Sequence, residues 1–449
     1  MALLLRGGLL ITMNAERAVL TADILVEGDR IAALAPDLPP ADSAGVPLAL
    51  EDVVDLSGKV VIPGLIQGHM HLTQALFRGL CDDLALMEWL RERIWPLEGA
   101  HSAASNAVSA RLAAAELLRS GTTAVVDMGT VHHEDAIFET MRDVGMRGLF
   151  GKSLMDGGEG VPPSLLEEAD VGLAETERLI HDWHMTGNGR LRYAVAPRFV
   201  PSCSKRLLAS ARDLARHNGL RLHTHASENL GEIALVESLH HMRNVVLLHK
   251  LGYTGKDVVL AHCIWLDDEE KKILADTGTH VAHCPSSNTK MASGIAPIVE
   301  LRALGVDVAL GLDGAHNHMD ALMEIRQASI LQKARLHEPT ALPALEALEL
   351  ATLGGASALG QADDLGSLEV GKKADLAVLD MDMLHTLPGW GRDPVQRVVY
   401  EATRENVVHT MIDGVFVYRD RQFLTLDLEQ TLKDAERLCG DAARRAGLA

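Results

Sequence analysis

The sequence predicts an α/β fold: a (β/α)8 TIM barrel with a small β-sandwich domain built from both chain termini. Strand and helix signals alternate through the middle of the chain, and β-rich segments with turn residues occupy its two ends. Its 449 residues suit one large domain plus a smaller one. We expect an N-terminal β part at residues 1–58, the barrel at 59–365, a C-terminal β part at 366–426 and a final amphipathic helix at 427–449.

The two ends of the chain carry similar β-rich units. Residues 22–32 predict a strand, a Gly28-Asp29 turn and a second strand. Residues 374–380 and 407–417 show strand patterns near the other end. We therefore expect the terminal strands to pair in one small β domain.

Eight strands, each followed by a helix, are expected in the middle of the chain. The first begins at Val60, and the others are expected at 121–127, 147–151, 192–197, 220–225, 258–262, 281–283 and 308–313. The clearest helix patterns are at 103–120, 137–144, 205–218, 231–239, 268–276 and 298–304. Such alternation predicts a parallel sheet, and eight units that close on themselves form the barrel.

Composition narrows the class of protein. The formal net charge of −20, from 62 acidic and 42 basic residues, disfavours nucleic acid and anionic membranes as partners. Five cysteines without a C-x-x-C pair predict neither a disulfide framework nor a cysteine zinc site. With no membrane-length apolar run and no signal-peptide pattern, we expect a cytoplasmic protein.

Metal-ligand residues stand at the ends of the predicted strands, where barrel enzymes place their active sites. His69 and His71 form a His-x-His pair whose side chains point to the same face of a strand. His225, His262 and Asp313 end three later strands. Three imidazoles and one carboxylate make a plausible zinc site with room for water, and a divalent metal lowers the pKa of bound water toward neutrality.

Glu228 follows His225 by three residues, so it is the best candidate for a general acid/base beside this metal site. The alternative is a carboxylate in the first turn of a helix, stabilised by the helix dipole.

These residues lie in motifs that resemble the amidohydrolase superfamily, in its deaminase and chlorohydrolase branch. The matching segments are 63–71, Arg78-Gly79, Met87-Glu88-Trp89-Leu90, 225–228, 261–263, 286–294, 311–314 and 371–376. The resemblance implies one divalent metal, zinc by default with iron or manganese as alternatives, held by His69, His71, His225 and Asp313. It also implies that His262 orients the attacking hydroxide, Glu228 protonates a ring nitrogen and Asp313 helps to take the proton from water. A homodimer is expected from the same resemblance.

For the small heterocyclic substrate, the resemblance first favours an adenosine-type nucleoside: 5'-deoxyadenosine, methylthioadenosine or S-adenosylhomocysteine. Glu98 would bind the ribose hydroxyls, and Trp89 is a further substrate-binding candidate. Lys152 stands where a basic residue would approach a homocysteine-like tail; the alternative is a solvated surface lysine. The Asp313-Gly314-Ala315 run fits the same substrate class.

Other substrates remain open. Gln74 and Arg198 resemble the residues with which guanine deaminases bind the purine, which makes guanine, another aminopurine or a pterin the second hypothesis; Arg198 could also be a structural ion-pair partner. Chloride displacement from an s-triazine is a third. His316 and His318 could flank the ring pocket or be exposed loop histidines. A binding protein without activity is a further class, disfavoured by the complete ligand set.

Overall fold

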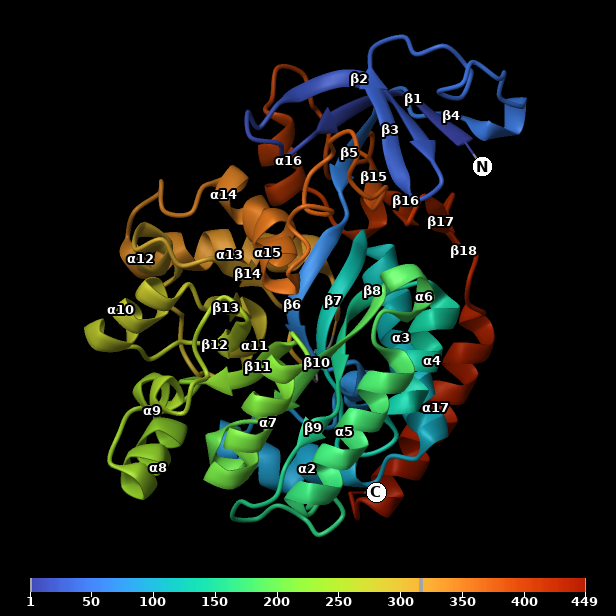
Figure 1. Ribbon diagram of the computed structural model, residues 1–449. Helices are drawn as coiled ribbons and strands as arrows, with labels where there is room; N and C mark the ends of the chain where they lie inside the picture. The colour runs from blue at the N-terminus through green and yellow to red at the C-terminus, as the bar shows by residue number, and fades with distance from the viewer. Residues whose placement is uncertain (1, 315–317, 449) are drawn as a thin grey trace.

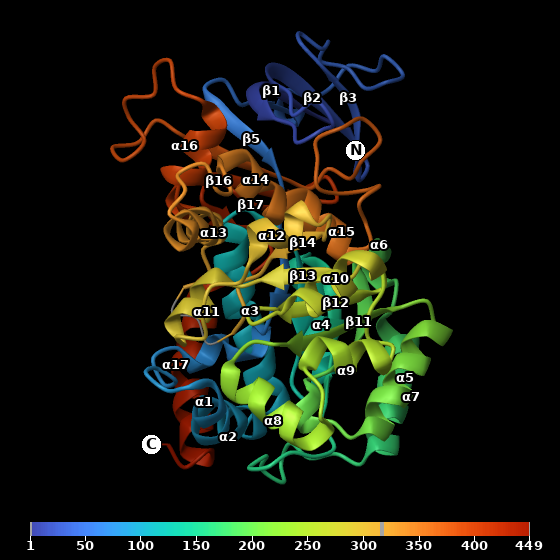
Figure 2. The same cartoon turned by 90° about the vertical axis from the view of Figure 1, so that its left-hand side faces the viewer.

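The computed structural model describes residues 2–314 and 318–448, which form a barrel and a terminal β sheet (Figure 1). The terminal sheet lies beyond the N-terminal ends of the barrel strands, and the two chain termini lie at opposite ends of the molecule (Figure 2). The predicted α/β fold is thus confirmed.

Eight parallel strands form the barrel, in the order in which they follow along the chain. They are β6 (Leu65–Met70), β7 (Thr122–Met128), β8 (Arg147–Gly151), β10 (Leu191–Pro197), β11 (Arg221–Ala226), β12 (Val258–His262), β13 (His280–His283) and β14 (Val308–Leu310). The short β9 (Ser153–Leu154) also pairs with β10. One parallel bridge, between Met70 and Asp313, joins the last strand to the first. All eight expected strands are present, and the barrel is nearly closed.

The first barrel strand begins at Leu65, five residues later than expected. Residues Lys59–Pro63 form β5, which pairs with β1 (Ala2–Ile11) and β15 (Leu376–Asp380) in the terminal sheet. The chain changes sheets at Gly64, where a Cβ atom would lie 2.1 Å from the Thr123 Oγ1 atom, so only glycine permits this close approach. The domain limits themselves stay a prediction.

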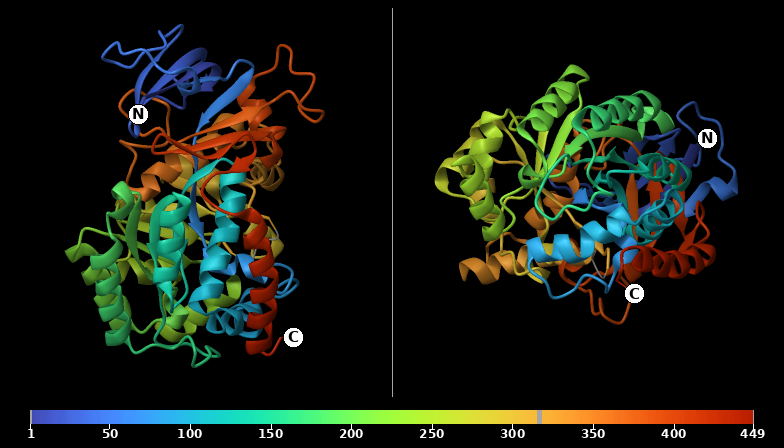
Figure 3. Two further views of the ribbon diagram at one scale, coloured as in Figure 1. Left: turned by 90° about the vertical axis from the view of Figure 1, so that its right-hand side faces the viewer. Right: turned by 90° about the horizontal axis from the view of Figure 1, so that it is seen from below.

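Helices surround the barrel, as Figure 3 shows from the side and from below. The main ones are α3 (Ala103–Arg119), α4 (Glu134–Val144), α5 (Ala169–Trp183), α7 (Lys205–His217), α8 (Leu230–His240), α10 (Asp268–Thr277), α12 (Ile298–Ala303) and α13 (Ala321–Leu336). Helix α5 was not among the clear sequence patterns, because three of its four fully buried residues are Ala169, Gly172 and Thr176. The final helix, α17 (Leu428–Arg445), packs against α3.

Both chain ends contribute to one mixed sheet, in the order β18-β17-β16-β15-β5-β1-β2-β3 with β4 beside β1. The strands not yet defined are β2 (Val19–Glu27), β3 (Arg30–Ala35), β4 (Val53–Asp55), β16 (Val407–Ile412), β17 (Val415–Arg419) and β18 (Gln422–Phe423). The expected pairing of terminal strands is therefore present.

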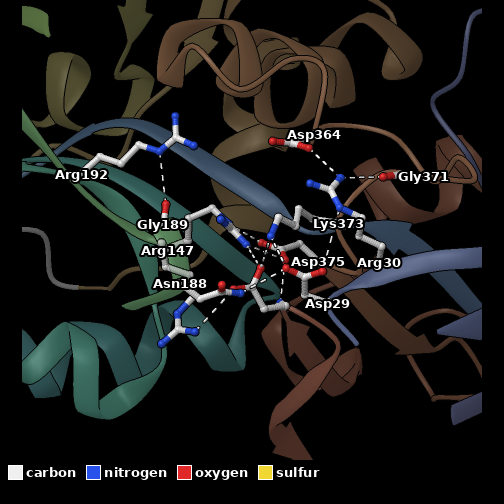
Figure 4. A network of polar contacts seen from close by, with 12 residues as sticks. Asp29, Arg30, Arg147, Asn188, Gly189, Arg192, Asp364, Gly371, Lys373 and Asp375 are labelled. Carbon is white, nitrogen blue, oxygen red and sulfur yellow. Dashed lines mark hydrogen bonds and ion pairs between the residues drawn. The ribbon is translucent and has the colours of Figure 1, made fainter. Parts of the chain in front are cut away.

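A buried ion network connects the barrel to the terminal sheet (Figure 4). Arg147, at the start of β8, is 1% exposed and donates hydrogen bonds to Asp375 at 2.8 and 3.2 Å. It also pairs with Asp413, whose Oδ1 atom lies 3.5 Å from the Lys373 Nζ atom. Because Arg147 belongs to the barrel and both aspartates belong to the terminal sheet, this network fixes one part against the other.

No helix in the described ranges, 2–314 and 318–448, is both long and apolar enough to cross a membrane.

Replacing Arg147 by Met should lower the free energy of unfolding by about 3–5 kcal/mol, because it removes the cation that pairs with the buried Asp375 and one of the cations around Asp413. Urea unfolding followed by circular dichroism measures the loss. Arg178→Met is the control: Arg178 is 41% exposed, and its ion pairs should contribute at most about 1 kcal/mol. Equal losses in both variants would contradict the role of the buried network.

Candidate metal centre and active site

Four buried side chains converge at the C-terminal end of the barrel. His69 is on β6, His71 follows that strand, His225 is on β11 and Asp313 follows β14. One ligand atom from each lies within 4.8 Å of the others, and none of the four residues is more than 8% exposed. The bridge between Met70 and Asp313 brings the first and last strands together here.

The hydrogen bonds of His71 and His225 leave one nitrogen of each ring facing the centre. The His71 Nδ1–H donates to the Met128 carbonyl at 2.7 Å, and the His225 Nδ1–H donates to the Arg198 carbonyl at 2.7 Å. Burial lowers the pKa of both imidazoles well below its usual value, so both rings are neutral and neither Nε2 carries hydrogen. These Nε2 atoms lie 3.2 Å apart and cannot bond to each other. Two lone pairs aimed at one point fit a metal ion.

A second histidine, His223, orients His69 in the same way, with the hydrogen on Nδ1 and the Nε2 lone pair toward the centre. The His223 Nδ1–H donates to the Val259 carbonyl at 3.1 Å, which leaves the His223 Nε2 to accept from the His69 Nδ1–H at 2.8 Å. The His69 Nε2 then faces the centre, 3.3 Å from the Asp313 Oδ1, and has no hydrogen-bond partner in the ranges 2–314 and 318–448. The sequence analysis missed His223, although His223-Thr224-His225 is a second His-x-His pair.

Asp313 completes the group with one carboxylate oxygen. Its Oδ1 lies 3.3 Å from the His69 Nε2 and 3.5 Å from the His71 Nε2, while its Oδ2 accepts a hydrogen bond from Ser287. Asp313 also adopts a positive φ of 63°, a conformation that non-glycine residues rarely take and that functional sites often hold. The four residues, His69, His71, His225 and Asp313, therefore form a metal-binding site.

Glu228 and His262 lie beside this site. The His262 Nδ1–H donates to the Asn288 Oδ1 at 2.9 Å, and its Nε2 is 3.6 Å from the Glu228 Oε2. Burial raises the pKa of Glu228 to about 7. Burial also opposes protonation of His262, but the carboxylates of Glu228 and Asp313 outweigh it and raise the pKa of that imidazole. A buried carboxyl group and imidazole are thus placed to move protons near neutral pH.

Gln74, Glu98 and Arg198 form one buried network. Arg198 donates to both carboxylate oxygens of Glu98, at 2.5 and 3.3 Å, and the Gln74 Nε2 donates to the Glu98 Oε1 at 2.9 Å. The sequence analysis associated these residues with two different substrates, whereas they contact one another. The ion pair considered for Arg198 is present.

A small cavity lies against three of the metal-binding residues, His71, His225 and Asp313. Its volume is about 20 Å³, the size of a single water molecule. The lining comprises His71, Leu86, Trp89, Leu90, Arg198, Phe199, His225, Glu228, His262 and Asp313. Trp89, whose indole N–H donates to the Cys81 carbonyl at 2.9 Å, also lines a second small cavity with Ser287 and Gly314. Trp89 therefore borders both cavities.

Lys152 is not a surface residue, so the expectation of a solvated lysine was wrong. It is 1% exposed, its Nζ lies 2.5 Å from the Glu167 Oε2, and it is not among the lining residues of the cavity. The strong ion pair with Glu167 makes this burial possible. His318 is exposed, and His316 and Ala315 lie outside the described residues.

Comparison with known proteins identifies the family. Residues 60–417 match the model of the amidohydrolase family. The chain belongs to this family. The amidohydrolase is 37% identical over 415 residues to a 5'-deoxyadenosine deaminase from Methanothermobacter thermautotrophicus, with 92% of this chain and 93% of the relative covered.

Two further comparisons, one of sequence and one of structure, also match deaminases. A 5-methylthioadenosine/S-adenosylhomocysteine deaminase from Syntrophobacter fumaroxidans is 37% identical over 434 residues, 96% of each chain. The solved structure of an adenosine deaminase from Xanthomonas campestris with bound zinc superposes with a TM-score of 0.90 at 31% identity, covering 98% of each chain.

Replacing His223 by Leu should weaken zinc binding by roughly 10- to 100-fold, because the outer nitrogen of His69 loses its acceptor. Competition with a chromogenic chelator measures the affinity. His280→Leu is the control, since His280 is also buried but stands at the opposite end of a barrel strand. Unchanged zinc affinity in the His223 variant would refute its orienting role.

Proposed function

We propose that this amidohydrolase hydrolyses the exocyclic amino group of an adenosine-type nucleoside, with 5'-deoxyadenosine, methylthioadenosine and S-adenosylhomocysteine as candidate substrates, and releases ammonia. The observation that carries the proposal is the position of Glu228 and His262 on the wall of the cavity that the metal ligands His71, His225 and Asp313 also line. The activities for which the two deaminase relatives are named support it. A homodimer and a cytoplasmic location stay predictions.

We propose zinc as the metal, because three imidazoles and one carboxylate suit it, with iron or manganese as alternatives. The related adenosine deaminase with bound zinc supports this choice. A divalent metal held by His69, His71, His225 and Asp313 would act as a Lewis acid and lower the pKa of water toward neutrality.

The residues beside the ligands would carry the protons. His262, fixed by its bond to Asn288, would orient the attacking water, and Asp313 would accept a proton from it. Glu228 would protonate the ring nitrogen next to the carbon under attack. As the bond from the water oxygen to that carbon forms, Asp313 would hold the proton taken from the water and pass it to the amino group. The bond from carbon to nitrogen then breaks, ammonia leaves, and the remaining hydroxyl proton returns to Glu228 as the ring carbonyl forms.

Glu98 would bind the ribose hydroxyls, held in position by Arg198 and Gln74. A cavity of about 20 Å³ cannot hold a nucleoside, so substrate entry requires the wall to move. Trp89 would be a point of opening, because it borders both this cavity and the small cavity beside Ser287 and Gly314.

A second candidate function is deamination of guanine, another aminopurine or a pterin. Arg198 lines the cavity, whereas Glu98 does not, and the buried Gln74 Oε1 has no hydrogen-bond partner among the described residues. Both features suit direct contact with a polar ring. Attack of water on an s-triazine carbon that bears chloride would use the same groups. An ammonia- and chloride-release screen across nucleosides, free bases, pterins and a chlorotriazine separates these candidates.

Glu228→Gln should reduce ammonia release from the preferred substrate by about 100-fold or more, because an amide cannot deliver the proton. Bound zinc, measured by atomic absorption, should stay at the wild-type level. Glu237→Gln, on the exposed surface of α8, is the control. Full activity in the Glu228 variant would exclude it as the proton donor.

Glu98→Ala should impair deamination of nucleosides far more than that of free bases, because only nucleosides present ribose hydroxyls. The ratio of kcat/KM for 5'-deoxyadenosine to that for adenine measures this selectivity. Equal losses on both substrates would show that Glu98 acts only by positioning Arg198.

A further inference from the structure

A larger cavity, remote from the metal-binding residues and from the two small cavities beside Trp89, opens at the N-terminal end of the barrel strands. Its volume is about 420 Å³, within the range of small-molecule sites. It lies at the starts of β10 and β11, beside Gly360 at the end of α15 (Gly355–Leu359). The cavity is thus separate from the proposed active site and needs its own explanation.

Positive charge is concentrated in the lining of this cavity. Four cationic side chains, Arg192, Arg216, Arg221 and Lys256, line it with a single carboxylate, Asp257. That carboxylate is already paired, since its Oδ2 lies 2.9 Å from the Arg216 Nε. A concentration of positive charge in a chain with a net charge of −20 indicates attraction of an anion.

Two of these arginines lack an acidic partner. The Arg192 Nε–H donates only to the Gly189 carbonyl, at 3.2 Å, and Figure 4 shows its guanidinium apart from the carboxylates that hold Arg147 and Arg30. Arg221 donates to the Ser357 carbonyl at 2.8 Å. Neither forms an ion pair within the described part of the chain. Burial lowers the pKa of both guanidinium groups, so an anion beside them would be stabilising.

Two neighbouring groups adapt the cavity to such a ligand. The Tyr193 backbone N–H donates to the His184 Nδ1 at 3.1 Å, so neutral His184 carries its hydrogen on Nε2 as an additional donor. A Cβ atom on Gly360 would lie 2.7 Å from the Arg221 Nη2, so the glycine leaves space for this guanidinium.

We propose that this cavity binds a phosphate group, either free phosphate or the phosphate of a small organic ester, through Arg192 and Arg221, with Lys256 and His184 as additional donors. Arginine forms paired hydrogen bonds with phosphate, and two guanidinium groups with unused N–H donors meet that requirement. The competing explanation is structural: Arg221 bonds a carbonyl in the last turn of α15, where a cation stabilises the helix dipole.

Thermal unfolding of the zinc-loaded enzyme tests the proposal. Inorganic phosphate should raise the unfolding midpoint more than sodium chloride at equal ionic strength. The phosphate Kd should increase about tenfold or more in Arg192→Gln/Arg221→Gln, because charge-assisted hydrogen bonds are lost. Equal midpoints in phosphate and chloride would overturn the proposal, and so would a wild-type phosphate response in the double variant.

A second variant, Lys256→Glu, tests the site even if the double variant fails to fold. It places a negative charge at the cavity, and Lys256 is an exposed residue. It should weaken phosphate binding, whereas Lys272→Glu, on the exposed face of α10, should not. Equal phosphate affinity in these two variants would refute the site. A parallel titration with ribose 5-phosphate identifies the source: tighter binding than that of inorganic phosphate supports an organic ester, and equal binding supports free phosphate.

Discussion

The metal-binding site depends on one constraint: each imidazole that faces the centre must direct its hydrogen outward. Carbonyl groups of barrel strands and their following loops impose this on His71 and His225, and the Val259 carbonyl imposes it on His69 through His223. Backbone carbonyls accept hydrogen bonds and cannot donate them, so the tautomers are set by the fold. The barrel therefore does more than place these side chains close together; it also decides which nitrogen of each ring is available.

The two ends of the barrel have opposite chemistry. Buried neutral imidazoles and carboxyl groups occupy the C-terminal ends of the strands, while arginines dominate the N-terminal ends. At that second end, Arg147 neutralises two aspartates of the terminal sheet, whereas the hydrogen bonds that Arg192 and Arg221 form with the described part of the chain go to carbonyl groups. Buried arginine is thus paired with carboxylates where the barrel contacts the terminal sheet, whereas the two cavity arginines have no such carboxylate partner among the described residues.

Sequence reasoning identified the metal ligands because strand ends meet at one edge of a parallel barrel, so His69, His71, His225 and Asp313 could be associated without coordinates. It could not identify Asn288 or His223 as orienting groups, since their roles depend on distances between side chains of different strands. Lys152 was ambiguous for a related reason: a lysine is buried only where a carboxylate such as Glu167 reaches it, and that contact joins residues 15 apart. The first barrel strand was predicted to begin at Val60 and not at Leu65, because both segments are apolar. Only their pairing partners show that they belong to different sheets.

The bridge between Met70 and Asp313 has a consequence for biosynthesis. The ligands come from the first strand of the barrel, from the middle of its sequence and from just after its last strand, so the site spans residues 69 to 313. Contacts so distant in sequence form only after most of the intervening chain has been ordered. During translation, therefore, no emerging segment shorter than nearly the whole barrel can present the four ligands together. Metal incorporation is a late event in the maturation of this chain, and a bound metal ion marks a barrel whose two edges have met.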